Sequence, residues 1–136
     1  MLEGTVMDIY YKEVIGIIDE IRKTERESIM VADQVKQDKL VYVFGSGGHS
    51  NLAAMEVFFR AGGLMHISAI LNQETMLSSG ALKSMQTERL PGYGKIVVED
   101  YGIGEGDLFL ICNAYGINSA TIDAALTAKE RGAMVI

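Results

Sequence analysis

Apolar residues recur at helical spacing in the N-terminal part of the chain. Within residues 2–37 they appear every three or four positions, and charged side chains fall mostly between them. No glycine or proline occurs between Gly16 and Gly45. This pattern predicts one long helix, or two shorter helices with a break around Arg22–Arg26.

The pattern changes after this segment. Residues 40–44 form a continuous apolar run that is rich in β-branched and aromatic side chains, as is typical of a parallel strand buried on both faces. Helical spacing returns over residues 51–61, with Ser50 or Asn51 available as the N-cap. Residues 64–70 read as a second strand. The order predicts a strand–helix–strand unit with a right-handed crossover.

The next stretch, residues 71–106, is less regular. Residues 81–89 have the spacing of a short helix, and Pro91-Gly92 marks a break. Residues 95–99 fit either a strand or a helical turn, because a short apolar run has no clear period.

The strand–helix pattern then repeats toward the C-terminus. It predicts a strand over 107–112, a turn over 113–118, a helix over 119–131 and the start of a fourth strand over 133–136. The order indicates a single α/β domain over residues 1–136, with a helical segment of about 2–37 and an α/β core of about 40–136.

The last predicted strand has nothing after it. A doubly wound parallel sheet normally continues with a further helix and strand. We therefore expect an α/β domain that lacks its C-terminal portion; the alternative is a complete small α/β domain.

Charge and composition narrow the function. The 18 acidic and 12 basic residues leave a net charge of −6, which disfavours binding to nucleic-acid phosphates. The single cysteine, Cys112, excludes an internal disulfide. The N-terminus lacks the pattern of a signal peptide, and no apolar run is long enough for a membrane span. We expect a cytoplasmic protein with no membrane partner.

A glycine-rich loop follows the first strand. Residues 45–50 read Gly-Ser-Gly-Gly-His-Ser, and glycines leave room for a ligand close to the backbone. Amide groups at the start of the next helix attract anions, and Ser46 and Ser50 add hydroxyls. The loop matches neither the Walker A motif nor the full dinucleotide fingerprint, because Ser50 replaces the third glycine. It predicts an anion site; the alternative is a tight turn with a capping serine.

A second loop is expected beside the first. Residues 113–118 follow the third predicted strand, and loops after parallel strands gather at the carboxyl edge of the sheet. The pairing of two such loops is a stronger indication of a ligand site than either loop alone.

The same segments resemble the sugar isomerase (SIS) domain family, and in particular a group of bacterial SIS proteins regarded as phosphosugar binders. The resemblance covers about residues 10–136 and rests on the strand and GSGGHS loop of 41–50, the helix end of 59–64, the segment Thr87–Tyr93, and the pieces of 106–113 and 128–132. It implies a flavodoxin-like three-layer α/β/α sandwich with a five-stranded parallel sheet, assembled as a homodimer or a higher homo-oligomer. It also implies a small sugar phosphate as ligand, held by hydroxyls and backbone amides of both loops.

The second loop departs from the family pattern. Relatives typically read Ser-Asn-Ser-Gly, whereas this chain reads Cys-Asn-Ala-Tyr-Gly over residues 112–116, and its first loop looks one residue longer. Fewer hydroxyls leave fewer donors for a phosphate. The expected ligand contacts are Ser46, Gly47, Gly48 and Ser50 in the first loop, and Asn113, Tyr115, Asn118, Ser119 and Thr121 in or after the second.

Two side chains are candidates for proton transfer. Isomerisation through an enediol needs a carboxylate or histidine within reach of the sugar, and we select Glu56 and His49. The alternatives are a solvated helix glutamate and an exposed turn histidine. Cys112 reads better as a small buried residue than as a nucleophile. One cysteine and two histidines make no zinc motif, so we expect no metal and no cofactor.

Three functions remain open on the sequence. The first is a sugar-phosphate isomerase that interconverts an aldose and a ketose. The second is a non-catalytic or regulatory module that binds a phosphosugar. The third is a fragment whose site is incomplete. A shared fold does not decide among them.

Overall fold

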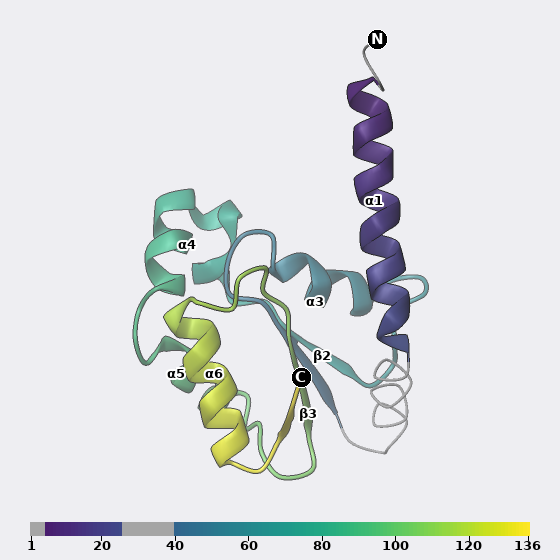
Figure 1. Ribbon diagram of the computed structural model, residues 1–136. Coiled ribbons are helices and arrows are strands. Elements are labelled where there is room, and N and C mark those ends of the chain that lie inside the picture. The colour runs from purple at the N-terminus through teal and green to yellow at the C-terminus, as the bar shows by residue number, and fades with distance from the viewer. Residues whose placement is uncertain (1–4, 26–39) are drawn as a thin grey trace. The chain divides into compact units, whose positions relative to one another are not determined.

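The computed structural model describes residues 5–25 and 40–136. The chain divides into two compact units, Met1–Gln37 and Asp38–Ile136. The described part of the first unit is helix α1, Val6–Lys23 (Figure 1). A capping box begins it: Asp8 N–H donates to Thr5 Oγ1, and Thr5 N–H donates to the Asp8 carboxylate at 2.7 Å. The helix ends within the predicted break, and the predicted helix beyond Glu25 lies outside the described residues.

The second unit contains a four-stranded, fully parallel sheet in the order β2-β1-β3-β4. Its strands are β1 (Val41–Phe44), β2 (Ile67–Ile70), β3 (Leu108–Ile111) and β4 (Met134–Val135). The predicted strands are confirmed in place and direction, but β2 starts three residues later than expected. Only four residues of β1 are available to pair with it, and Met65 is fully exposed.

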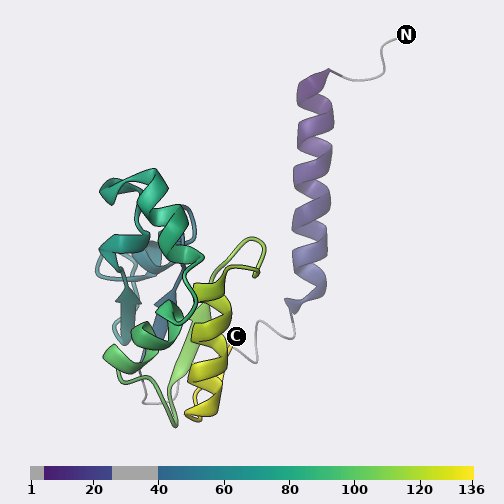
Figure 2. The same cartoon turned by 90° about the vertical axis from the view of Figure 1, so that its left-hand side faces the viewer.

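Helices cover the sheet in layers. They are α3 (Asn51–Val57), α4 (Ala81–Glu88), α5 (Tyr93–Asp100) and α6 (Ser119–Glu130). Helix α3 contacts β1 and β2, whereas α6 contacts β3, β4 and α5. Right-handed crossovers that run toward opposite edges of a sheet place their helices on opposite faces. Figure 1 shows α5 and α6 together on one side of the strands, and Figure 2 views the sheet from that side. The expected three-layer α/β fold is confirmed, with four strands among the described residues rather than five.

Two helix predictions change in detail. Helix α3 ends at Val57 and not near residue 61, because Phe58 takes an extended conformation and the Leu64 amide bonds back to the Val57 carbonyl. Residues 95–99, left open between strand and helix, lie inside α5. Ser50 precedes α3, but its side chain makes no capping hydrogen bond.

The core lies between the sheet and the α5–α6 layer. Phe44 of β1 and Phe109 of β3 are fully buried, with ring centroids 6.2 Å apart. Val97 and Val98 of α5 and Ala124 of α6 pack against this face. This packing holds β1 and β3 side by side, so the loops that follow these two strands emerge next to each other.

Candidate functional site

The first loop, residues 45–50, closes on itself at the carboxyl end of β1. Gly45 lies directly against the backbone of Ser50, and the Asn51 amide donates to the Gly47 carbonyl at 3.3 Å. Gly47 has a φ of +116°, which L side chains rarely adopt. The glycines are therefore required by the turn itself, as well as leaving room for a ligand.

Asn113 organises the second loop. Its Oδ1 accepts from the amides of Tyr115 and Gly116 at 3.0 and 2.7 Å, which is a side-chain turn typical of asparagine. Its Nδ2 donates to Thr121 Oγ1 at 3.2 Å. Asn113 thus fixes the backbone of the loop and ties it to the start of α6.

A buried hydrogen bond joins the two loops. The hydroxyls of Ser46 and Thr121 lie 2.5 Å apart, although the residues are separated by 75 positions, and both side chains are buried. Beside this contact is a hollow of about 230 Å³, lined by His49, Ser50, Ala53, Cys112, Asn113 and Ala114. The two loops therefore form one continuous surface at the carboxyl edge of the sheet.

Backbone donors are available at this surface. Among the residues that the structure describes, the amides of Gly47, Gly48 and His49 donate no hydrogen bond to the chain. The 12-residue helix α6 begins at the second loop, and Asn118, its N-cap, makes no side-chain cap. Unpaired amides beside the positive end of a helix favour an anion.

Segment 71–88 packs against the first loop. Asn51 Nδ2 donates to the carbonyls of Gly47 and Thr75 at 2.8 and 3.3 Å, and Ser84 Oγ also donates to Thr75 at 2.7 Å. Asn51, Thr75 and Ser84 are all buried. These three residues were not among those that the sequence predicted for the site. The available signal was a polar residue on the apolar face of a predicted helix.

The structure brings most of the predicted ligand contacts, and the catalytic candidate His49, together. Ser46, Gly47, Gly48, His49, Ser50, Asn113 and Thr121 all lie in the two adjoining loops or in the bridge between them. Asn118 and Ser119 follow at the partly buried start of α6. Tyr115 is 84% exposed at the tip of its loop. Glu56 lies elsewhere. It is near the C-terminal end of α3, away from the first loop, and forms an ion pair with Arg60.

Comparison with known proteins identifies the fold family. The sequence model of the SIS domain matches residues 9–136. The chain belongs to the SIS domain family. It is 38% identical over 137 residues to a UPF0309 protein of Caldanaerobacter subterraneus subsp. tengcongensis, covering 96% of this chain and 55% of that protein. It is 36% identical over 136 residues to a UPF0309 protein of Brucella ovis, covering 96% and 56% respectively. The chain thus spans about half the length of these curated relatives.

Over residues 5–25 and 40–136, no three His, Cys, Asp or Glu side chains gather in a way that could hold a metal ion. Within the same ranges, no helix combines the length and apolar character that crossing a membrane requires.

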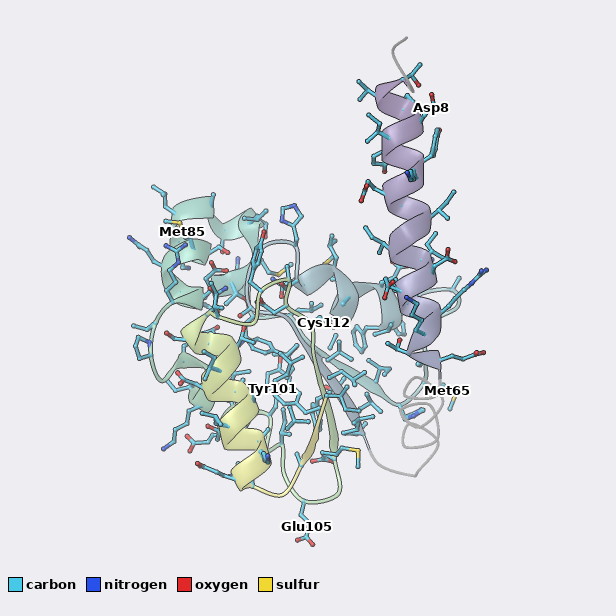
Figure 3. All side chains as sticks on the ribbon, viewed as in Figure 1. Asp8, Met65, Met85, Tyr101, Glu105 and Cys112 are labelled. Carbon is cyan, nitrogen blue, oxygen red and sulfur yellow. The ribbon has the colours of Figure 1, made fainter. Side chains whose placement is uncertain are left out.

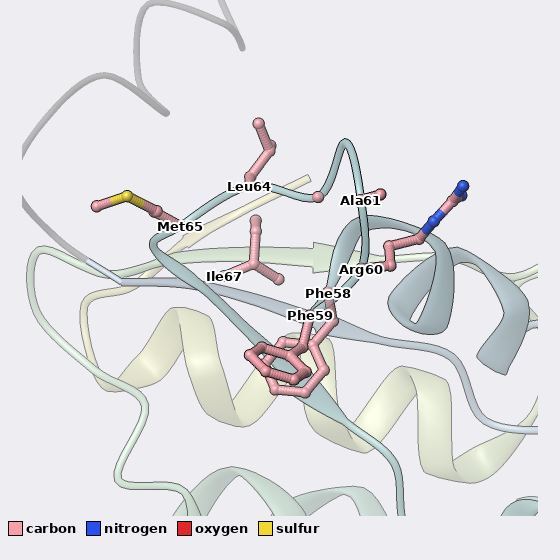
Figure 4. A pocket seen from close by; sticks show the side chains of 8 residues that line it. Phe58, Phe59, Arg60, Ala61, Leu64, Met65 and Ile67 are labelled. Carbon is pink, nitrogen blue, oxygen red and sulfur yellow. The ribbon is translucent and has the colours of Figure 1, made fainter.

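A larger hollow lies away from the two loops. It measures about 560 Å³ and is lined by eight residues between Phe58 and Ile67, on the turn between α3 and β2 (Figure 4). Its lining is apolar apart from Arg60, and Phe59 and Met65 are almost fully exposed. The hollow lies before β2 begins, whereas the two loops follow the carboxyl ends of β1 and β3.

Cys112 directly follows the end of β3 (Figure 3). Its thiol is half-buried in the lining of the loop hollow, and burial raises the thiol pKa. The thiolate is the reactive form of cysteine. Cys112 is therefore less reactive at neutral pH than a free thiol.

The single cysteine makes this testable by alkylation. We expect iodoacetamide to modify Cys112 in the folded chain at pH 7 at least about tenfold more slowly than in the urea-unfolded chain, because burial limits thiolate formation and access. The alkylation rate of the folded chain should keep rising above pH ~8.5, where a free thiol is half titrated. A rate that levels off below that pH would contradict the raised pKa.

Proposed function

We propose that this SIS domain binds a phosphorylated sugar, with the phosphate held between the loops of residues 45–50 and 113–118. The observation that carries the proposal is the buried Ser46–Thr121 hydrogen bond, which sets the two loops side by side. The amides of Gly47, Gly48 and His49 and the start of α6 supply donors. Ser50 and Asn113 add polar side chains to the hollow between the loops. An α/β sheet places ligands at this edge.

The reaction class in this proposal is isomerisation of an aldose phosphate to a ketose phosphate. A base removes the proton from C2 of the open-chain aldose, an enediol forms, and the proton returns to C1 while the hydroxyl proton of O2 passes to O1. His49, which is exposed in the loop and lines the hollow, is the first candidate for this base. Glu56 remains the second candidate from the sequence, although its pairing with Arg60 occupies the carboxylate.

The alternative is a phosphosugar-binding module without catalysis. It is favoured by the position of Glu56 and by the second loop, where an alanine and a tyrosine follow Asn113. A homodimer or higher homo-oligomer is part of the same proposal and rests on the family resemblance. A cytoplasmic location is proposed with it, because a single cysteine suits a reducing compartment. An isomerisation assay on a sugar phosphate that binds would separate enzyme from module.

Thermal unfolding with a ligand panel tests binding. The panel contains hexose, pentose, heptose and amino-sugar phosphates, each compared with its unphosphorylated sugar. A ligand at about 100 times its Kd should add about 2.7 kcal/mol to the free energy of unfolding. We expect stabilisation by at least one phosphate ester and none by its free sugar. If every phosphate ester and its free sugar changed the melting temperature equally, in a chain that melts cooperatively, a phosphate site would be excluded.

A matched pair of variants locates the site. Ser50 is partly exposed and lines the loop hollow. Ser50→Asp places a negative charge there and should abolish the phosphate-dependent shift, whereas the similarly sized, neutral Ser50→Asn should keep most of it. Equal shifts in the two variants would place phosphate elsewhere.

A further inference from the structure

The C-terminal end of α4 reaches the first loop. The Glu88 carboxylate occupies the space that a side chain at Gly47 would fill, so it lies directly against the backbone of the loop. Gly47 is buried and Glu88 is partly buried. An acidic side chain therefore adjoins the surface that we propose for phosphate.

This carboxylate has unused hydrogen-bonding capacity. Over the described residues, the Glu88 carboxylate makes no hydrogen bond and no ion pair with another group of the chain. An ionised carboxylate only accepts hydrogen bonds, at up to about four positions. A partly buried acceptor of this kind needs donors, which water or a ligand must provide.

Asn51 adds a second unused acceptor near Gly47. Its Nδ2 is committed to the carbonyls of Gly47 and Thr75, and these two acceptors fix the orientation of the amide. Its Oδ1 is buried and has no partner within the described structure, in a residue that is only 2% exposed. Buried polar atoms without partners are uncommon in folded proteins. The Asn51 amide therefore holds the Gly47 carbonyl from α3, while the Glu88 carboxylate approaches the same glycine from α4.

The hydrogen-bond acceptors and the hydrogen-bond donors at the loop suit different parts of a ligand. A phosphate accepts hydrogen bonds and is repelled by a carboxylate, whereas sugar hydroxyls and amino groups donate. The free amides of the first loop suit the phosphate. The Glu88 carboxylate suits the hydroxyl or amino groups of the molecule that carries it.

We propose that Glu88 recognises the sugar portion of the bound phosphate ester by accepting hydrogen bonds from its hydroxyl or amino groups. This inference rests on the proposed function and deepens it. The ligand is a phosphate ester with several hydrogen-bond donors close to the phosphate, and inorganic phosphate alone does not benefit from Glu88.

Calorimetric titration of Glu88→Gln and Glu88→Ala tests this inference. The probes are inorganic phosphate, fructose 6-phosphate, ribose 5-phosphate, glucosamine 6-phosphate and sedoheptulose 7-phosphate. In the unmodified chain we expect at least one ester to bind at least about tenfold more tightly than inorganic phosphate, as one charge-assisted hydrogen bond allows. Both variants should reduce the ratio of the ester's affinity to that of inorganic phosphate about tenfold. Inorganic phosphate itself should bind equally or more tightly, because a repelling charge is gone.

The opposite responses of the two probes separate recognition from a structural role. Glu130→Gln, a change of the same kind at the exposed end of α6, should alter neither affinity. The inference is overturned if the Glu88 variants weaken inorganic phosphate and the esters equally, if the ratio stays unchanged, or if no ester exceeds inorganic phosphate in the unmodified chain. If neither inorganic phosphate nor any ester binds, the proposed function fails as well.

Discussion

Replacing Gly94 with alanine should destabilise the α/β unit by about 1–3 kcal/mol, the range typical of overpacking a core. Gly94 is buried within α5, and a Cβ there would overlap the backbone of α6 at Ala120 and Ala124. Backbone atoms cannot rotate away as side chains do, so the two helices would have to separate. Both helices pack on the same core as Phe44 and Phe109, and the cost should therefore appear as a lower stability of the whole unit.

The sign of this effect is informative, because alanine is a better helix former than glycine by about 1 kcal/mol. Without the contact, Gly94→Ala would stabilise the chain. Gly16→Ala in α1 is the matched control: a Cβ there meets nothing within 4 Å, so helical content should stay equal or rise. Urea denaturation followed by circular dichroism measures both. An unchanged or higher midpoint for Gly94→Ala would show that α5 and α6 do not approach so closely.

Replacing Gly45 with alanine should remove phosphate binding and also lower stability. A Cβ at Gly45 would overlap the carbonyl group of Ser50, so the first loop would have to open. Opening moves the amides of Gly47 and Gly48 out of position for a single anion. We expect a loss of at least about tenfold in affinity for a phosphate ester, since more than one hydrogen bond to a charged group is disturbed.

Gly48→Ala is the control for this second prediction. The same change in the same loop would meet only the Leu77 side chain, which is half-exposed and able to move. Its effect on affinity should be clearly smaller. Titration with inorganic phosphate and with the phosphate ester that stabilises the chain most compares the two variants. Equal losses for both would mean that crowding by Leu77, rather than closure of the loop, controls the site.

Much of the local structure could be predicted from the sequence. Strands β1 and β3 are short, continuous apolar runs followed by turn residues, and helix α6 is an alanine-rich segment followed by Gly132. Such signals depend on neighbouring residues alone. The family resemblance and the pairing of two loops at one edge of a parallel sheet followed from the order of these elements.

Where local signals were weak, tertiary contacts determined the outcome. Residues 95–99 have no clear period, and they are helical because α5 packs its buried face, including Gly94 and Val97, on the core and α6. Helix α3 stops at Val57 although its spacing continues, because the Leu64 amide bonds back to Val57 and a turn follows. Helix propensity, which depends on neighbouring residues, does not predict a helix end that is set by a hydrogen bond from a later residue.

The sequence alone determined the fold class, the two loops and the residue types available for an anion. Only the tertiary structure decided which of those residues meet. The Ser46–Thr121 hydrogen bond spans 75 positions, and Glu88, on a helix of the irregular segment, comes to lie against Gly47. The physical reason is that such contacts follow from how helices pack on a sheet, and this packing depends on interactions from the whole chain. A sequence pattern reports only the spacing of apolar residues that are close together in the chain.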